Sequence, residues 1–198
     1  MTRPPLNLFI IGPSGSGKST QAKLIADKYG LTHLSMGQLL RDEMAAKSNY
    51  GLEAKKYINQ GKWVPDELAY QVLRNKLELI DNSNFIIDGF PRMLNQALLI
   101  EEYFSSRNQT VSLLILLSVT YEEIAQRRQK MGQAFQESNR TDNTPKAIAS
   151  RQKSYDDTAD PIIYHYQKLK KLFEVEGNRP IGPIFNDICQ KIDSLNQN

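Results

Sequence analysis

The stretch GPSGSGKST, residues 12–20, follows directly on the largely apolar run of residues 6–11. Its glycines let backbone N–H groups point inward with no side chain in the way, and a helix that begins here adds unpaired N–H donors and the positive end of its dipole. The spacing GxxxxGK[ST] is typical of a phosphate-binding loop, in which Lys18 reaches the outer phosphates and the Ser19 hydroxyl ligates Mg²⁺. We therefore expect a buried strand, a tight loop and a helix that together hold a nucleoside triphosphate.

Composition and charge limit the classes to which this chain can belong. It has 198 residues, of which 40% are hydrophobic, and a formal net charge of +3, which favours one core with excursions and is too weakly basic for a nucleic-acid-binding surface. The single cysteine, Cys189, excludes an internal disulfide and a cysteine-rich zinc site. The N-terminal apolar run is too short for a signal peptide, and residues 111–119 are too few to span a bilayer. We expect a soluble cytoplasmic protein with no nucleic-acid or membrane partner.

Five short apolar runs, separated by segments long enough for helices, are predicted to be strands. They are residues 6–11, 33–35, 85–88, 111–118 and 172–175. Strands that alternate with helices form a parallel sheet with helices on both faces, which is an α/β three-layer sandwich. Residues 37–80 contain about three helical patterns and no strand, and the polar stretch around residues 127–143 forms a second interruption. We expect both to be excursions from the sheet.

Three helix starts carry their own sequence signals. Thr120 followed by Glu123 has the spacing of a capping box. The Thr-Pro pair at residues 144–145 places proline at a first helical position, and the sequence PDE at residues 65–67 puts acidic residues at the positive end of a helix dipole. We expect a helix to begin at each of these places.

The stretch FIIDGFPR, residues 85–92, is an apolar strand that ends in Asp88 and turns into Arg92. Next to a phosphate-binding loop, such a strand would lie beside the first strand, set Asp88 near the Mg²⁺ shell and aim Arg92 at the phosphates. Arginines on separate elements supply planar, permanently charged clamps for a reaction between two phosphorylated molecules. These arginines are Arg41, Arg92, Arg127, Arg140 and Arg151. The basic pair Arg127-Arg128, taken alone, is more often a solvated surface.

Further stretches extend the pattern along the chain: LTHLSMGQLLRDE at 31–43, GKWVPDEL at 61–68, NRTDN at 139–143 and ASRQKSYDDTADPII at 149–163. With FIIDGFPR, their order and spacing resemble those of the nucleoside monophosphate kinases, most of all the adenylate kinases, over nearly the whole chain. The resemblance implies a monomer with a five-stranded P-loop core, a helical monophosphate-binding excursion and a lid of the short form, which has no zinc site. The core would comprise residues 1–34, 66–126 and 144–198, the excursion residues 35–65, and the lid residues 127–143.

The resemblance also implies roles for individual residues. The residues that match the ATP site are Gly12, Pro13, Ser14, Gly15, Ser16, Gly17, Lys18, Ser19, Thr20, Arg127 and Gly177. Those that match the AMP site are Ser35, Met36, Arg41, Val64, Gly89, Arg92, Gln96, Arg140 and Arg151, with Gln96 reading the adenine. The catalytic set would be Lys18, Arg92, Arg127, Arg140 and Arg151. Ser19, and Asp88 through water, would hold the Mg²⁺ that accompanies ATP.

The reaction implied by the resemblance is the reversible transfer of the γ-phosphoryl group of Mg·ATP to AMP, which gives two ADP. It needs no general base, because the second pKa of the acceptor phosphate is about 6 and its oxygen is already anionic at neutral pH. His33 and His165 are therefore interpreted as packing or surface residues.

Some positions depart from the usual family pattern and leave alternatives open. Met36 replaces a threonine near the acceptor base, Gln38 replaces an aspartate, Met131 replaces a lid arginine, and Asn143 replaces a lid acid. One alternative is a UMP or CMP kinase, which Met36 allows and Gln96 argues against. A second is a kinase of small-molecule hydroxyl groups, with the aspartate of FIIDGFPR as its base, and a third is a non-catalytic nucleotide-sensing module with a degraded lid.

Overall fold

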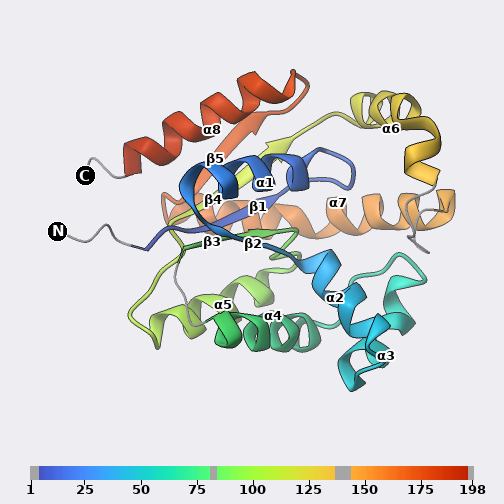
Figure 1. The fold of residues 1–198 in the computed structure, drawn as a ribbon, viewed down its shortest axis with the longest axis horizontal. Coiled ribbons are helices and arrows are strands. Elements are labelled where there is room, and N and C mark those ends of the chain that lie inside the picture. Colours follow the sequence, from blue (N-terminus) through green and yellow to red (C-terminus); the bar gives the residue numbers. More distant parts are fainter. Residues whose placement is uncertain (1–4, 81–83, 137–143, 196–198) are drawn as a thin grey trace.

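A central sheet of five parallel strands organises the molecule. The computed structural model describes residues 5–80, 84–136 and 144–195. The strands are β1 (Asn7–Ile11), β2 (Thr32–Ser35), β3 (Phe85–Asp88), β4 (Leu113–Ser118) and β5 (Leu172–Glu176). Their order across the sheet is β2-β3-β1-β4-β5, so the first strand lies in the middle (Figure 1). All five apolar runs that were predicted to be strands are strands, and none of their ends differs from the prediction by more than two residues.

Alternation along β1 divides the core into two parts, one on each face of the sheet. Leu8 and Ile10 pack against α1 (Lys18–Tyr29) and α8 (Ile181–Leu195). Phe9 and Ile11 face the opposite side, where α4 (Asp66–Ile80), α5 (Leu94–Ser105) and α7 (Pro145–Lys168) cover the sheet (Figure 1). Every residue of β1 is buried because both faces of the strand are covered. The predicted three-layer α/β sandwich is confirmed.

Two more helices, α2 (Met36–Ala45) and α3 (Asn49–Ile58), follow β2 and pack against each other beside the sheet. A Cβ atom at Gly51 would lie 2.0 Å from the carbonyl oxygen of Glu43, so glycine permits this close helix pair. With α4 they make three helices and no strand among residues 37–80, as predicted. The predicted start of the lid at residue 127 falls inside α6 (Tyr121–Gln136), and residues 137–143 lie outside the described part of the chain.

The three predicted helix starts are present, but one of them is capped differently. Thr144 accepts a hydrogen bond from the N–H of Ala147 at the start of α7, and α4 begins with its acidic residues. Before α6, Thr120 accepts from the N–H of Glu123 at 3.3 Å, which is half of a capping box. The other half is wrong: the N–H of Thr120 donates to the side chain of Asn178, and the carboxylate of Glu123 instead pairs with an arginine one turn along α6.

The strand register brings the predicted site residues to one edge of the sheet. Asp88 at the end of β3 lies opposite Ile10 of β1 on one side and Ser35 of β2 on the other. Because parallel strands present their carboxyl ends at the same edge, the loops that follow β1, β2 and β3 converge there. None of the helices in the described residues is long and apolar enough to cross a membrane.

Candidate functional site

The phosphate-binding loop joins β1 to α1 at the centre of the sheet edge. Gly12 has a φ of +148°, and a Cβ atom there would lie 2.5 Å from the carbonyl oxygen of Leu117 on β4, so no other residue fits without movement. Lys18, the first residue of α1, turns back over the loop and donates from Nζ to the carbonyl oxygen of Pro13 at 2.8 Å and to the Ser16 hydroxyl at 3.5 Å. The ammonium group therefore lies over the hollow of the loop, where phosphates bind in loops of this type.

A hydroxyl and a carboxylate meet beside this loop. Ser19 donates from Oγ to Oδ2 of Asp88 at 2.5 Å, and the Asp88 side chain is only 5% exposed. Nε2 of His33 lies 3.9 Å from the same carboxylate oxygen and finds no hydrogen-bond partner among the described residues. A hydroxyl paired with a carboxylate is a set of hard oxygen donors that suits Mg²⁺. Within the described residues, no cluster of three or more His, Cys, Asp or Glu side chains could hold a metal ion.

Three predicted arginines reach the same cleft from separate elements. Arg92, in the turn after β3, donates from Nε to the carbonyl oxygen of Gly89 at 2.9 Å. Arg41 on α2 donates to Oε1 of Gln38 at 2.8 Å, so the residue that departs from the family pattern here orients the arginine. Arg151 on α7 is buried and donates from Nε to the carbonyl oxygen of Ala147. The resulting cleft is strongly cationic.

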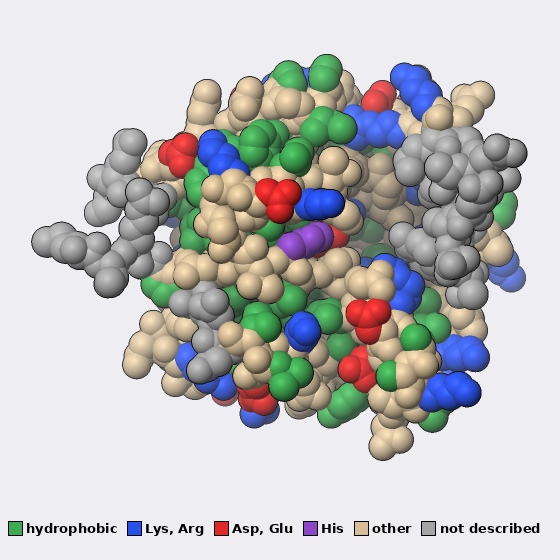
Figure 2. Space-filling model, viewed as in Figure 1, with side chains coloured by type: hydrophobic (Ala, Val, Ile, Leu, Met, Phe, Trp, Pro, Cys, Tyr) green, Lys and Arg blue, Asp and Glu red, His purple; other side chains and the backbone are tan. Residues whose placement is uncertain are grey.

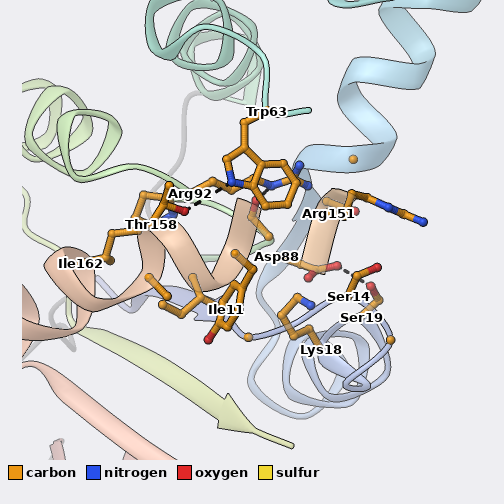
Figure 3. A pocket seen from close by; sticks show the side chains of 18 of the residues that line it. Ile11, Ser14, Lys18, Ser19, Trp63, Asp88, Arg92, Arg151, Thr158 and Ile162 are labelled. Atoms are coloured by element: carbon orange, nitrogen blue, oxygen red, sulfur yellow. Dashed lines mark hydrogen bonds between the residues drawn. The ribbon is translucent and has the colours of Figure 1, made fainter. Parts of the chain in front are cut away.

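Figure 3 shows how the cleft is arranged, with Ser14, Lys18 and Ser19 at one end, Trp63 and Arg92 at the other, and Asp88 between them. The predicted site residues that line it are Gly12, Ser14, Gly15, Lys18, Ser19, Ser35, Arg41, Asp88, Gly89, Arg92 and Arg151. Its cavity volume is about 160 Å³. This is below the roughly 300 Å³ at the lower end of small-molecule pockets, so in this conformation the cleft has room for phosphates rather than for two whole nucleotides.

A second pocket, of about 620 Å³, lies on the other side of the phosphate-binding loop. Arg127 on α6 spans it and donates to the carbonyl oxygens of Ser16, at 2.8 Å, and of Gly177. Gly17 and Thr20 line the same pocket, so the two hydroxyl groups that follow Lys18 face different spaces: Ser19 faces the cleft and Thr20 this pocket. The predicted ATP-site residues are thus divided between two adjoining cavities, apart from Pro13 and Gly177, which line neither.

Other predicted residues do not line either cavity. Met36 and Val64 are buried in the core beside α2 and α4. Gln96 is also buried, and its amide accepts from the N–H of Arg92 and donates to Asp66, each at 2.9 Å. If Gln96 binds adenine as predicted, its amide makes that hydrogen bond in addition to those with Arg92 and Asp66. Arg140 and Asn143 lie outside the described residues, as does the side chain of Met131.

Three residues at the site were not singled out from the sequence. Trp63 lies against Arg92, and Tyr155 lines the cleft with a pKa that burial and then the nearby Asp156 carboxylate raise to about 12. Arg128 was interpreted as part of a solvated basic pair, but it donates to the carbonyl oxygen of Ser14 at 2.8 Å, and burial lowers its pKa. The signal for Arg128 was its position one residue after Arg127, which places both guanidinium groups on the loop.

On the face shown in Figure 2, the described Lys and Arg side chains are interspersed with acidic and polar ones and do not merge into one continuous patch.

Comparison with known proteins identifies relatives along nearly the full chain. The family model described as adenylate kinase matches residues 10–171. An adenylate kinase of Azobacteroides pseudotrichonymphae is 36% identical over 191 residues, which are 96% of this chain and 98% of the relative. An adenylate kinase of Bacteroides thetaiotaomicron is 37% identical over 96% of this chain and all of the relative, and one of Prochlorococcus marinus is 38% identical over 91% of this chain and 95% of the relative. With its P-loop sheet and its arginine-lined cleft, this chain belongs to the adenylate kinase family.

Proposed function

We propose that this chain transfers the γ-phosphoryl group of Mg·ATP reversibly to AMP and so forms two ADP. The observation that carries the proposal is the meeting of Lys18, Arg41, Arg92 and Arg151 in one cleft, although they come from four separate parts of the chain. Two phosphorylated substrates bring a large negative charge together, and cations from several directions offset it. The family membership of the chain supports the same reaction.

The cleft divides into a donor end and an acceptor end. Lys18 and the loop amides would cradle the outer phosphates of ATP, while Arg41 and Arg92 would hold the phosphate of AMP. The pocket between Arg127 and the loop after β5 adjoins the donor end and would receive the adenine of ATP. In this assignment the two phosphate chains meet near Asp88, in the middle of the cleft (Figure 3).

Positioning and electrostatics then account for the chemistry. The acceptor oxygen is anionic at neutral pH, so the side chains hold it in line with the γ-phosphorus and remove no proton. Arg92 and Arg151 would stabilise charge on the transferred group, together with Arg127 and Arg140 if α6 and the lid close. Ser19 and, through water, Asp88 would hold the Mg²⁺ that accompanies ATP, and the ion would neutralise negative charge that develops during the transfer. Tyr155 stays neutral at working pH and adds no negative charge beside the phosphates.

We further propose that residues 35–65 and 127–143 close over the substrates as separate units around a fixed core. Closure excludes water, which would otherwise take the phosphoryl group from ATP. The buried Cys189, which makes no disulfide, suits a reducing compartment, and we expect a cytoplasmic monomer.

A panel of acceptors tests the proposed function. ADP formation from Mg·ATP is measured in a coupled assay with AMP, CMP, UMP or GMP as the acceptor, with Lys18→Ala as the inactive control and circular dichroism to verify its fold. We expect AMP to have the highest kcat/KM. Preference for UMP or CMP would contradict the acceptor assignment, and tight binding of ATP and AMP without ADP formation would contradict the enzyme assignment.

A further inference from the structure

Trp63, the only tryptophan in the chain, makes two specific contacts at the acceptor end of the cleft. It lies in the loop between α3 and α4, and the guanidinium carbon of Arg92 lies 4.2 Å from the centroid of its ring. Its Nε1–H donates to Oγ1 of Thr158 on α7 at 3.4 Å (Figure 3). Oγ1 of Thr158 in turn donates to the carbonyl oxygen of Ser154 at 2.8 Å, so the hydroxyl that receives the indole is itself fixed.

The contact with the ring restricts how Arg92 can present its donors. A guanidinium group is planar, and its N–H bonds all lie in that plane. In Arg92 one of them, Nε–H, is fixed by the carbonyl oxygen of Gly89 at 2.9 Å, and the indole packs against the group as a cation–π partner. These two constraints together set the direction of the remaining in-plane donors.

The same loop touches α7 at a second point. Gly61 has a φ of +69°, and a Cβ atom there would lie 2.6 Å from the carbonyl oxygen of Ala147. That carbonyl oxygen also accepts from Nε of Arg151. Gly61 and Trp63 therefore rest on α7 at residues 147 and 158, on either side of Arg151 along the helix. The loop therefore lies against the carbonyl oxygen of Ala147, which accepts from Arg151, and through Trp63 it contacts the guanidinium group of Arg92.

We propose that Trp63 is a positioning residue for the acceptor phosphate: it orients Arg92 and holds the acceptor-side loop on α7. The inference rests on the proposed function, since it assigns Arg92 to the phosphate of a nucleoside monophosphate. A core role alone would need only an apolar side chain at residue 63. Orientation of Arg92 needs an aromatic face, and attachment to α7 needs the Nε1–H donor.

Graded substitutions separate these roles. Trp63→Leu removes the ring and should lower kcat/KM for AMP about 5- to 30-fold, the range of a cation–π pair that is partly removed from water, while KM for ATP changes less than about twofold. Trp63→Phe keeps an aromatic face but lacks the Nε1–H donor, so it should recover the part of the loss that comes from the contact with Arg92. Thr158→Val removes the hydroxyl that accepts from the indole, together with the bond of that hydroxyl to the carbonyl oxygen of Ser154, and should cost about 2- to 10-fold in kcat/KM for AMP. As a matched control, Tyr164→Leu removes another cation–π pair on α7, with Lys168 at 4.6 Å, and should leave both KM values unchanged.

Two further measurements make the result independent of turnover. Calorimetry gives the Kd of AMP for each variant, and in the wild type the emission of Trp63 should change with AMP at that same Kd. If Trp63→Leu and the wild type have equal kcat/KM and equal Kd for AMP, Trp63 has no positioning role, and the proposed function still stands. If the wild type forms no ADP, the proposed function fails, and the Kd values then decide on Trp63: a loss of AMP affinity in Trp63→Leu that Trp63→Phe partly restores supports the inference, and equal affinities overturn it. Failure of the wild type to bind AMP overturns both.

Discussion

The hydrogen bond from Ser19 to Asp88 predicts two separable effects of the substitution Ser19→Ala. The Asp88 side chain is 5% exposed and accepts this bond at 2.5 Å. Nε2 of His33 lies 3.9 Å from the same carboxylate oxygen. Bonds to charged groups contribute about 1.5–3 kcal/mol to stability, and the lower value applies here because Ser19 is itself exposed and water can take its place. A loss of about 1.5 kcal/mol in a chain of this length lowers Tm by roughly 3–6 °C. Thermal unfolding of the ligand-free wild type and of Ser19→Ala measures this difference in Tm.

The second effect is on the metal dependence of the reaction. Because Ser19 faces the cleft and Thr20 faces the neighbouring pocket, Ser19→Ala should raise the Mg²⁺ concentration needed for half-maximal rate. Thr20→Ala is the matched variant: it should raise KM for ATP without altering the Mg²⁺ dependence, and it should change Tm by no more than about 2 °C. If the two variants have the same Tm and the same Mg²⁺ dependence, the assignment of Ser19 to the metal is wrong.

Four other substitutions test the site and the fold. Lys18→Ala should reduce kcat about a hundredfold or more with an unchanged circular dichroism spectrum, and near-normal turnover would exclude its role at the phosphates. Arg92→Ala should raise KM for AMP far more than the Kd of ATP; equal effects on both would mean that Arg92 does not belong to the acceptor end. Gly12→Ala should lower stability by about 3 kcal/mol or more, measured by denaturant unfolding, because its Cβ would meet the carbonyl oxygen of Leu117 at 2.5 Å. Tyr155→Phe should reduce the loss of stability at alkaline pH. Burial raises the pKa of Tyr155 to about 12, so its neutral form favours the folded state. This contribution is complete below pH 10 and is lost as the pH rises toward 12, by at most about 1.4 kcal/mol per pH unit.

The elements of the fold were predictable because each strand is a short apolar run between helix-length segments. Burial of both faces of β1 requires the continuous run that the sequence shows, and the proline at residue 145 fixes the start of α7. Apart from the position of β3 beside β1, which was predicted, the order of the strands did not follow from these patterns, since no periodicity records which strand pairs with which. Half of the predicted capping box at Thr120 is absent for a similar reason: the N–H of Thr120 donates to Asn178, which is 58 residues away along the chain.

At the site, the residues that carry charge in recognisable stretches were predicted, and those that act through contacts between distant elements were not. Trp63 in GKWVPDEL resembles a core aromatic residue, and only the fold brings it against Arg92 and Thr158. Arg128 looked like surface because its partner, the carbonyl oxygen of Ser14, is 114 residues away. Proposed roles for backbone carbonyl oxygens are harder still to predict, because every residue has one.

These carbonyl oxygens explain how the cleft can hold many cations and still accept a ligand. Lys18, Arg92, Arg128 and Arg151 each donate to at least one backbone carbonyl oxygen. Arg127 does so as well, but it also pairs with the carboxylate of Glu123 at 2.7 Å. The bonds to carbonyl oxygens orient the cations without neutralising them, and a bond to an anionic phosphate oxygen is roughly twice as strong as one to a neutral acceptor. An arriving nucleotide can therefore displace a carbonyl partner at little cost, whereas a carboxylate bound to the same cation competes with the nucleotide for it. Substituting an acidic residue at Thr158, beside Arg92 and Trp63, should for this reason weaken AMP binding more than Thr158→Val does, and calorimetry of the two variants measures the difference.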